Sequence, residues 1–196
     1  MAYYVNINRQ FGSLGRPIAK ALAEDLGIEY YDRDIIEQTA KKMGIPLKEA
    51  SDVEETWASP WERMAHPLGG GNAQVQDKLF AVEQEVILKM AAEGSAIFVG
   101  RCADFILRDR KCLNVFIYAP KEKRYLNCVN SLGMDPAEAR KMMEQVDKAR
   151  NLYWQRYAHH LPSDTESNQL MIDSSLFGVK GTAKLLVDIV REYFVD

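Results

Sequence analysis

A glycine turn flanked by arginines, near the start of the chain, is the segment best suited to chemistry. Gly12-Ser13-Leu14-Gly15 lies between Arg9 and Arg16, after an apolar run that favours a β-strand. Glycines let the backbone approach a phosphate group, and the free N–H groups at a helix start attract an anion. Arg16 and Pro17 stand where the usual phosphate loop has lysine and a hydroxyl residue. The alternative is a glycine turn that joins a strand to a helix and binds nothing.

The residues that we expect to bind phosphate are Arg9, Gly12, Ser13, Leu14, Gly15, Arg16 and Pro17. Arg101 follows Gly100 and an apolar run, so its guanidinium is expected at the edge of a sheet; a surface salt bridge with Asp104 is the alternative. Arg150 lies on a predicted helix, where a solvated face with charge pairs is the alternative. Cations around two phosphates suit phosphoryl transfer, which depends mainly on positioning and charge neutralisation.

The elements that must position these residues alternate between strand and helix. The predicted strands cover residues 3–7, 28–31, 95–99, 112–118 and 170–173. The predicted helices cover residues 18–26 (opening at Pro17), 32–43, 47–55, 74–93, 103–107, 122–132, 136–157 and 179–194. This alternation predicts an α/β layered fold with a parallel sheet of five strands, whose ligands bind at the carboxyl ends of the strands.

The whole chain limits the classes of function. Its 196 residues predict one domain, 1–196, with a mobile loop at 57–73 that contains prolines, glycines and two tryptophans. A net charge of −3 gives no basic field for a nucleic-acid polymer. No apolar run reaches the roughly 18 residues of a membrane span, and no signal peptide is visible. Three cysteines without metal-ligand spacing predict reduced thiols and a cytoplasmic protein.

Four segments together resemble the cytidylate kinase-like family, in the nucleoside monophosphate kinase branch of P-loop kinases. They are residues 8–16 (NRQFGSLGR), 98–104 (FVGRCAD), 115–120 (VFIYAP, with Lys123-Arg124 after it) and 171–175 (MIDSS). The resemblance implies a three-layer P-loop kinase-like fold, in which helices flank a parallel five-stranded sheet and a helical lid covers about 140–165. It also implies transfer of the γ-phosphoryl group of ATP to a nucleoside monophosphate, CMP-like by resemblance.

The resemblance assigns roles to particular residues. Arg16, Arg101 and Arg150 are the expected catalytic residues, and Asp32, Gly100 and Arg101 the expected acceptor-binding residues. Lys148, Arg150 and Arg156 are the expected lid residues. For Asp32, capping of the following helix is the alternative.

The sequence offers few acidic side chains for a metal ion near the glycine turn. Val99 and Cys102 stand where cytidylate kinases carry aspartates, so Mg²⁺ is expected to arrive with ATP and not at a dedicated protein site. Nucleotide substrates are the expected partners, with a homodimer possible. A nucleotide-binding sensor without turnover is the alternative function, and a kinase for a non-nucleotide acceptor is a third.

Overall fold

The computed structural model describes residues 2–44 and 72–194, and its centre is a parallel sheet of five strands. The strands are β1 (Tyr4–Arg9), β2 (Glu29–Tyr31), β3 (Ala96–Val99), β4 (Cys112–Tyr118) and β5 (Leu170–Asp173). Their spatial order is β2-β3-β1-β4-β5, and every neighbouring pair is parallel. All carboxyl ends therefore meet at one edge of the sheet, where the loops after β1 and β3 begin.

The described helices are α1 (Gly15–Leu26), α2 (Arg33–Met43), α5 (Asn72–Glu93), α6 (Ala103–Ile106), α7 (Lys121–Leu126), α8 (Pro136–Tyr157) and α9 (Gly178–Phe194). α7 continues into a short π-helical segment, Asn127–Ser131. Asp135 caps α8, because its carboxylate accepts hydrogen bonds from the N–H groups of Ala137 and Glu138. No helix in residues 2–44 or 72–194 is long and apolar enough to cross a membrane.

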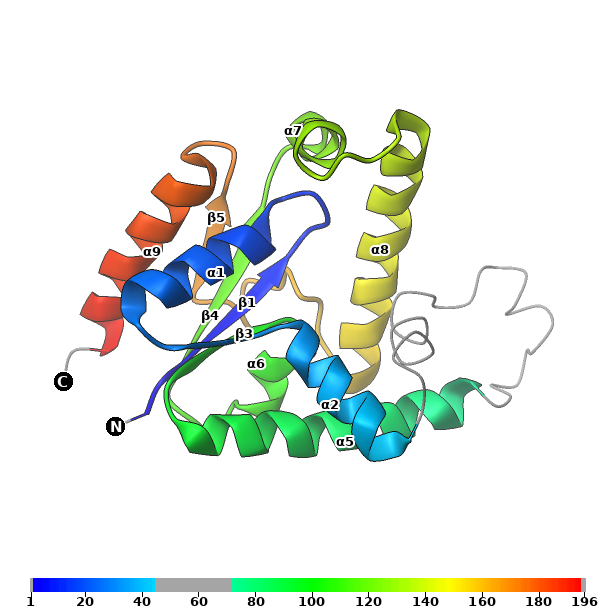
Figure 1. The fold of residues 1–196 in the computed structure, drawn as a ribbon, viewed down its shortest axis with the longest axis vertical. Helices are drawn as coiled ribbons and strands as arrows, with labels where there is room; N and C mark the ends of the chain where they lie inside the picture. The colour runs from blue at the N-terminus through cyan, green and yellow to red at the C-terminus, as the bar shows by residue number, and fades with distance from the viewer. Residues whose placement is uncertain (1, 45–71, 195–196) are drawn as a thin grey trace.

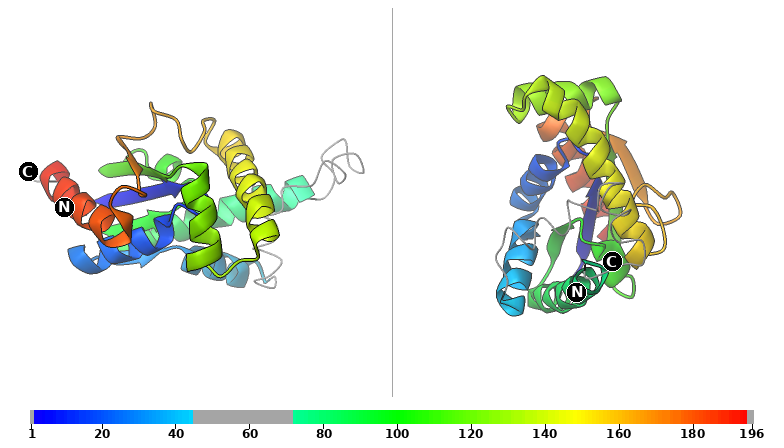
Figure 2. Two further views of the ribbon diagram at one scale, coloured as in Figure 1. Left: turned by 90° about the horizontal axis from the view of Figure 1, so that it is seen from above. Right: turned by 90° about the vertical axis from the view of Figure 1, so that its right-hand side faces the viewer.

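Alternate residues of each central strand point to opposite layers of helices. Val5 of β1 and Ile97 of β3 pack with residues of α1 and α9, whereas Tyr4 and Phe98 pack with residues of α5 and α6. Both faces of the sheet are therefore covered, which explains the apolar character of β3 (Figures 1 and 2). This is a three-layer P-loop kinase-like fold.

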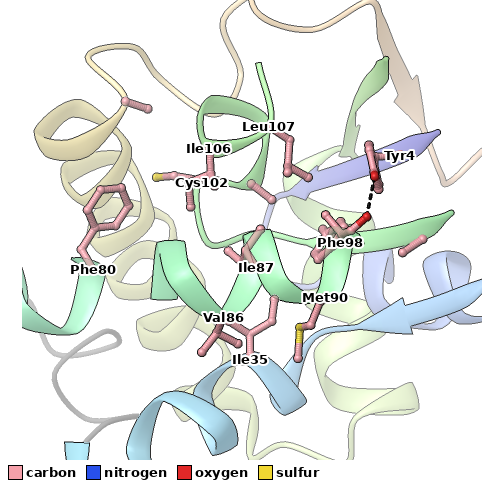
Figure 3. Packing of buried hydrophobic residues seen from close by; sticks show 14 of the residues in the cluster. Tyr4, Ile35, Phe80, Val86, Ile87, Met90, Phe98, Cys102, Ile106 and Leu107 are labelled. Atoms are coloured by element: carbon pink, nitrogen blue, oxygen red, sulfur yellow. Dashed lines mark hydrogen bonds between the residues drawn. The ribbon is translucent and has the colours of Figure 1, made fainter. Parts of the chain in front are cut away.

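The core on the α5 side of the sheet also contains residues of α8. Figure 3 shows Ile87 of α5 near Phe98 and Val86 beside Ile35 of α2, while Phe80 lies farther along α5; all belong to one core cluster. Two aromatic residues of α8 also belong to this core, which fixes one face of α8 against the body of the protein. Figure 1 shows α8 standing beside the loop that follows β1.

The alternation of strands and helices is confirmed, and the differences lie at element ends. α1 begins at Gly15, two residues before Pro17, because a proline is accommodated anywhere in the first turn, where its missing N–H costs nothing. The helix expected at 122–132 changes from α to π geometry after Leu126. The predicted helix 47–55 and most of the predicted loop 57–73 lie outside the described residues, and residues 72–73 belong to α5.

Candidate functional site

The loop between β1 and α1 (residues 10–14, here the glycine loop) presents backbone N–H groups at the start of a helix. Gly12 has φ 78° and Leu14 has φ 59°, so the chain turns through the left-handed region before α1 begins. No side chain of the described residues caps α1. The N–H groups in its first turn, which include those of Gly15 and Arg16, have no helical acceptor and can bind an anion.

Two glycines in this region are required by close approach of other atoms. A Cβ atom on Gly12 would lie 2.7 Å from the carbonyl oxygen of Arg124 and 2.8 Å from the Sγ atom of Cys128. A Cβ atom on Gly15 would lie 2.7 Å from the Cβ atom of Arg9. The sequence therefore uses glycine to let α7 and the Arg9 side chain pack directly against the loop.

Four arginines from separate parts of the chain line one cavity of about 60 Å³. They are Arg9 at the end of β1, Arg16 in the first turn of α1, Arg101 after β3 and Arg150 on α8. The rest of the lining is apolar or aromatic and comes from α8: Val146, Ala149, Tyr153 and Trp154. We call this the arginine cavity. Its composition suits a small anion with an apolar part.

A second cavity, of about 100 Å³, lies over the glycine loop. It is lined by Arg9, Gln10, Phe11, Gly12, Leu14, Gly15, Arg16, Pro17, Leu132 and Arg150. Three arginines, Arg9, Arg16 and Arg150, thus border both this loop cavity and the arginine cavity. Two anions bound in the two cavities would therefore share the same cations.

Asp32 lies directly beyond β2 and holds the Arg16 guanidinium. Its Oδ2 atom is 2.7 Å from Nε of Arg16, and its Oδ1 atom is 3.9 Å from Nη2 of Arg9. Asp32 occupies the N-cap position of α2, but its side chain makes no capping hydrogen bond. The capping alternative is therefore wrong for this side chain, which instead orients arginines that line the arginine cavity.

Arg101 is held by a buried carboxylate and not by Asp104. Nη1 of Arg101 lies 3.2 Å from Oε1 of Glu83, whose side chain is fully buried on α5. Burial lowers the pKa of Arg101 to about 10, so the guanidinium stays charged at neutral pH. Burial raises the pKa of Glu83, and the hydrogen bond from Tyr153 opposes that rise. Asp104 accepts a hydrogen bond from Trp154 instead.

Asp147 of α8 connects that helix to the glycine loop. Its Oδ1 atom accepts a hydrogen bond of 2.7 Å from the N–H group of Phe11, and its Oδ2 atom accepts one from Arg124. Arg150, one turn later, donates to the carbonyl oxygen of Arg9 at 3.1 Å. The two residues on one face of α8 therefore fix its distance from the loop.

The structure separates the other expected site residues from these cavities. The Ser13 hydroxyl lies within hydrogen-bond distance of the carbonyl oxygens of Gln10 and Ile117, at 2.9 and 3.1 Å, so it connects the glycine loop to the end of β4. Arg156 lies on another part of α8, where its Nε and Nη2 atoms donate hydrogen bonds to the carboxylate of Asp77. Lys148 is exposed and lines neither cavity. Gly100 lets the Arg9 guanidinium pass, because a Cβ atom there would meet its Nη1 atom.

Sequence reasoning missed Glu83 and Leu132. A signal for Glu83 existed, because it interrupts the apolar stripe formed by Phe80, Val86 and Ile87 at helical spacing. A carboxylate in such a stripe is rarely buried unless it is paired. Leu132 gave no comparable signal, because it enters the loop cavity only through the π-helical turn before it.

The expectation that Mg²⁺ arrives with ATP stays a prediction. No group of three histidine, cysteine, aspartate or glutamate side chains gathers within the described ranges. Asp32 pairs with Arg16 and Arg9 among the shared arginines, and Asp147 lies 3.9 Å from Arg150. If Mg²⁺ arrives with a phosphorylated ligand, it would neutralise part of the phosphate charge, and Arg9, Arg16 and Arg150 would hold the phosphate oxygens.

Known proteins resemble this chain in sequence and in fold. The sequence profile of the Cytidylate kinase-like family matches residues 4–176. A cytidylate kinase of Aeropyrum pernix is 26% identical over 182 residues, which cover 92% of this chain and 94% of that protein. An uncharacterized protein from Eubacterium ventriosum has a similar structure, with a TM-score of 0.69, 25% identity and 97% of both chains covered. A shikimate kinase from Bacteroides thetaiotaomicron shares the fold, with a TM-score of 0.57 at 12% identity, covering 97% of this chain and 99% of that one.

Proposed function

Because the chain belongs to the cytidylate kinase-like family, we propose that it transfers the γ-phosphoryl group of ATP to a nucleoside monophosphate. CMP is the first acceptor to test, since the Aeropyrum pernix relative is named a cytidylate kinase. The observation that carries the proposal is the convergence of four arginines on a cavity beside an uncapped helix start. Phosphoryl transfer needs this kind of arrangement, in which fixed cations surround two anions.

In this proposal the loop cavity binds the donor phosphates. The N–H groups at the start of α1 and the Arg16 side chain face the triphosphate, and the positive end of the helix dipole adds to their attraction. Mg²⁺ arrives with ATP, as proposed from the sequence. Arg16 replaces a lysine, and the bond between its Nε atom and Asp32 leaves the terminal nitrogens for phosphate oxygens.

The arginine cavity binds the phosphate of the acceptor. Arg101 enters it from the turn after β3, and Tyr153 and Trp154 supply an aromatic wall for the rest of the acceptor. Arg9 and Arg150 border both cavities, so they contact the group that moves from one side to the other. α8 serves as the lid helix, and its apolar residues exclude water from the reacting phosphates.

A coupled assay with ATP, Mg²⁺ and a panel of CMP, dCMP, UMP, AMP and GMP tests the proposal. We expect turnover with at least one of them, and Arg101→Ala should lower kcat/KM for that acceptor by about 100-fold, which is about 2.7 kcal/mol of transition-state stabilisation. Lys141→Ala is the control for the loss of a cation outside the site, because Lys141 is exposed and lines neither cavity. Thermal stabilisation by ATP without turnover on any acceptor would contradict the proposal and favour a nucleotide sensor.

A further inference from the structure

Glu83 is a buried carboxylate in a position where the helix pattern calls for an apolar side chain. Its neighbours on the same face of α5 are Phe80, Val86 and Ile87, which Figure 3 shows packed into the core. Its exposed fraction is 0%. A carboxylate taken fully out of water destabilises a protein by several kcal/mol unless charged or hydrogen-bonding groups compensate it. The position of Glu83 therefore needs an explanation in terms of its partners.

Each oxygen of Glu83 accepts from a different part of the cavity wall. Oε1 lies 3.2 Å from Nη1 of Arg101, and Oε2 accepts the hydroxyl hydrogen of Tyr153 at 2.5 Å. Arg101 and Tyr153 both line the arginine cavity, and Tyr153 belongs to α8. One carboxylate thus connects α5, the turn after β3 and the helix that faces the glycine loop.

The backbone that carries Arg101 has an unfavourable conformation, which contacts with its surroundings must stabilise. Gly100, Arg101 and Cys102 have φ values of 78°, 63° and 51°, so three successive residues lie in the left-handed region. For a residue with a Cβ atom this conformation costs about 1–2 kcal/mol, and it persists where the surroundings determine it. The side chain of Arg101 is only 15% exposed, and its ion pair with Glu83 is one contact that fixes its direction.

We propose that Glu83 is a positioning residue, which aims Arg101 at the acceptor phosphate and couples that arginine to α8 through Tyr153. The inference rests on the proposed function, because it concerns the acceptor side of the same site. Glu83 itself does not line the arginine cavity, so its effect on the acceptor passes through Arg101. A displacement of α8 would remove the Tyr153 donor from Glu83 and loosen Arg101, whereas an acceptor bound to Arg101 would favour the docked helix.

A double-mutant cycle on CMP affinity tests this coupling without requiring turnover. Glu83→Gln keeps the shape of the side chain but replaces one of its two acceptor oxygens by an NH₂ donor, so it cannot accept from both Arg101 and Tyr153 in this geometry, and isothermal titration calorimetry gives the Kd for CMP. We expect about a tenfold rise in Kd for Glu83→Gln, about a 100-fold rise for Arg101→Ala, and no further rise when the two are combined. Tyr153→Phe should raise Kd by about threefold and is the second variant if Glu83→Gln fails to fold. Glu85→Gln is the matched control, because Glu85 on the same helix pairs with Lys42 at the surface.

The outcomes separate this inference from the proposed function. A full tenfold effect of Glu83→Gln in the Arg101→Ala background would show that Glu83 does not act through Arg101, and would overturn the inference. An unchanged CMP Kd in both Glu83→Gln and Tyr153→Phe would overturn it as well, and a wild-type protein that binds none of the five monophosphates would overturn it together with the proposed function. Non-additive CMP binding in a protein that turns over no acceptor would support the inference while refuting the kinase activity.

Discussion

At the residue scale, Gly12 has no substitute, because two effects coincide there. Its φ of 78° disfavours any residue with a Cβ atom, and such an atom would also meet the Arg124 carbonyl and the Cys128 sulfur. Gly27 has a similar φ of 66° but nothing within 4 Å of its hypothetical Cβ atom. The pair therefore separates the cost of the backbone conformation from the cost of the contact.

Gly12→Ala should lower the free energy of unfolding by about 1–3 kcal/mol more than Gly27→Ala does, through overpacking against α7. Both variants share the left-handed backbone cost of about 1–2 kcal/mol. Urea denaturation followed by circular dichroism measures both. An equal loss in the two variants would show that α7 moves away from the loop without cost.

At the scale of elements, two ion pairs connect α7 with α8, and they differ in their surroundings. Asp147 pairs with Arg124 and also accepts the Phe11 N–H group, and its side chain is 23% exposed. Glu144 pairs with Lys121 at 3.1 Å, but its side chain is 72% exposed. A solvated pair of this kind contributes about 0–1 kcal/mol, whereas removal of a partly buried acceptor leaves its donors unpaired.

Asp147→Ala should therefore lower the free energy of unfolding by about 1–3 kcal/mol, and Glu144→Ala by less than about 1 kcal/mol. Guanidinium chloride is unsuitable because it screens ion pairs, so urea titration at low salt is the measurement. Similar losses in the two variants would mean that the bond between Asp147 and the glycine loop adds nothing to the docking of α8.

At the scale of the whole molecule, a buried carboxylate ties the segment after α8 to the core. Asp104 of α6 accepts a hydrogen bond from Trp154 of α8 at 3.2 Å, and Nε2 of His160 lies 3.5 Å from its other oxygen. Burial raises the pKa of Asp104 above its ordinary value of 3.8, and His160 and Trp154 oppose that rise. The carboxyl group of Asp104 therefore binds its proton more tightly in the folded protein than in the unfolded chain.

The stability that comes from protonated Asp104 is complete below the ordinary pKa and is lost as the pH rises through the folded-state pKa. Asp104→Asn removes this dependence, so the variant should gain stability relative to the wild type as the pH rises from about 4 to about 7. The gain is about 1.4 kcal/mol for each unit by which the folded state raises the pKa. Urea titrations across this range give the difference, with His160→Gln as the control for the facing imidazole. A difference that does not change with pH would contradict the prediction.

The sequence predicted the fold well, because it carries the fold in local patterns. The glycine loop, the apolar run of β3 and the Asp135-Pro136 start of α8 each signal an element through its own residues. The four arginines that line the arginine cavity could be singled out for the same reason, since each follows a strand or lies on a helix at the expected edge. Their partners were not found, because the hydrogen bonds that Arg101 donates to Glu83 and the Phe11 N–H group donates to Asp147 join residues 18 and 136 positions apart. Packing between elements decides those pairs.

The path of the Arg9 side chain restricts which residues homologous proteins can carry at neighbouring positions. It runs against Gly15 at its base and Gly100 at its tip, so a single large side chain makes both glycines necessary. Because the Cβ atom of Arg9 is the atom nearest to a Cβ atom at residue 15, only glycine at residue 9 would release the constraint on residue 15, while the positive φ of Gly100 would still restrict residue 100. Positions 9 and 15 should therefore covary among homologues, and a chain with alanine at 15 should carry glycine at 9.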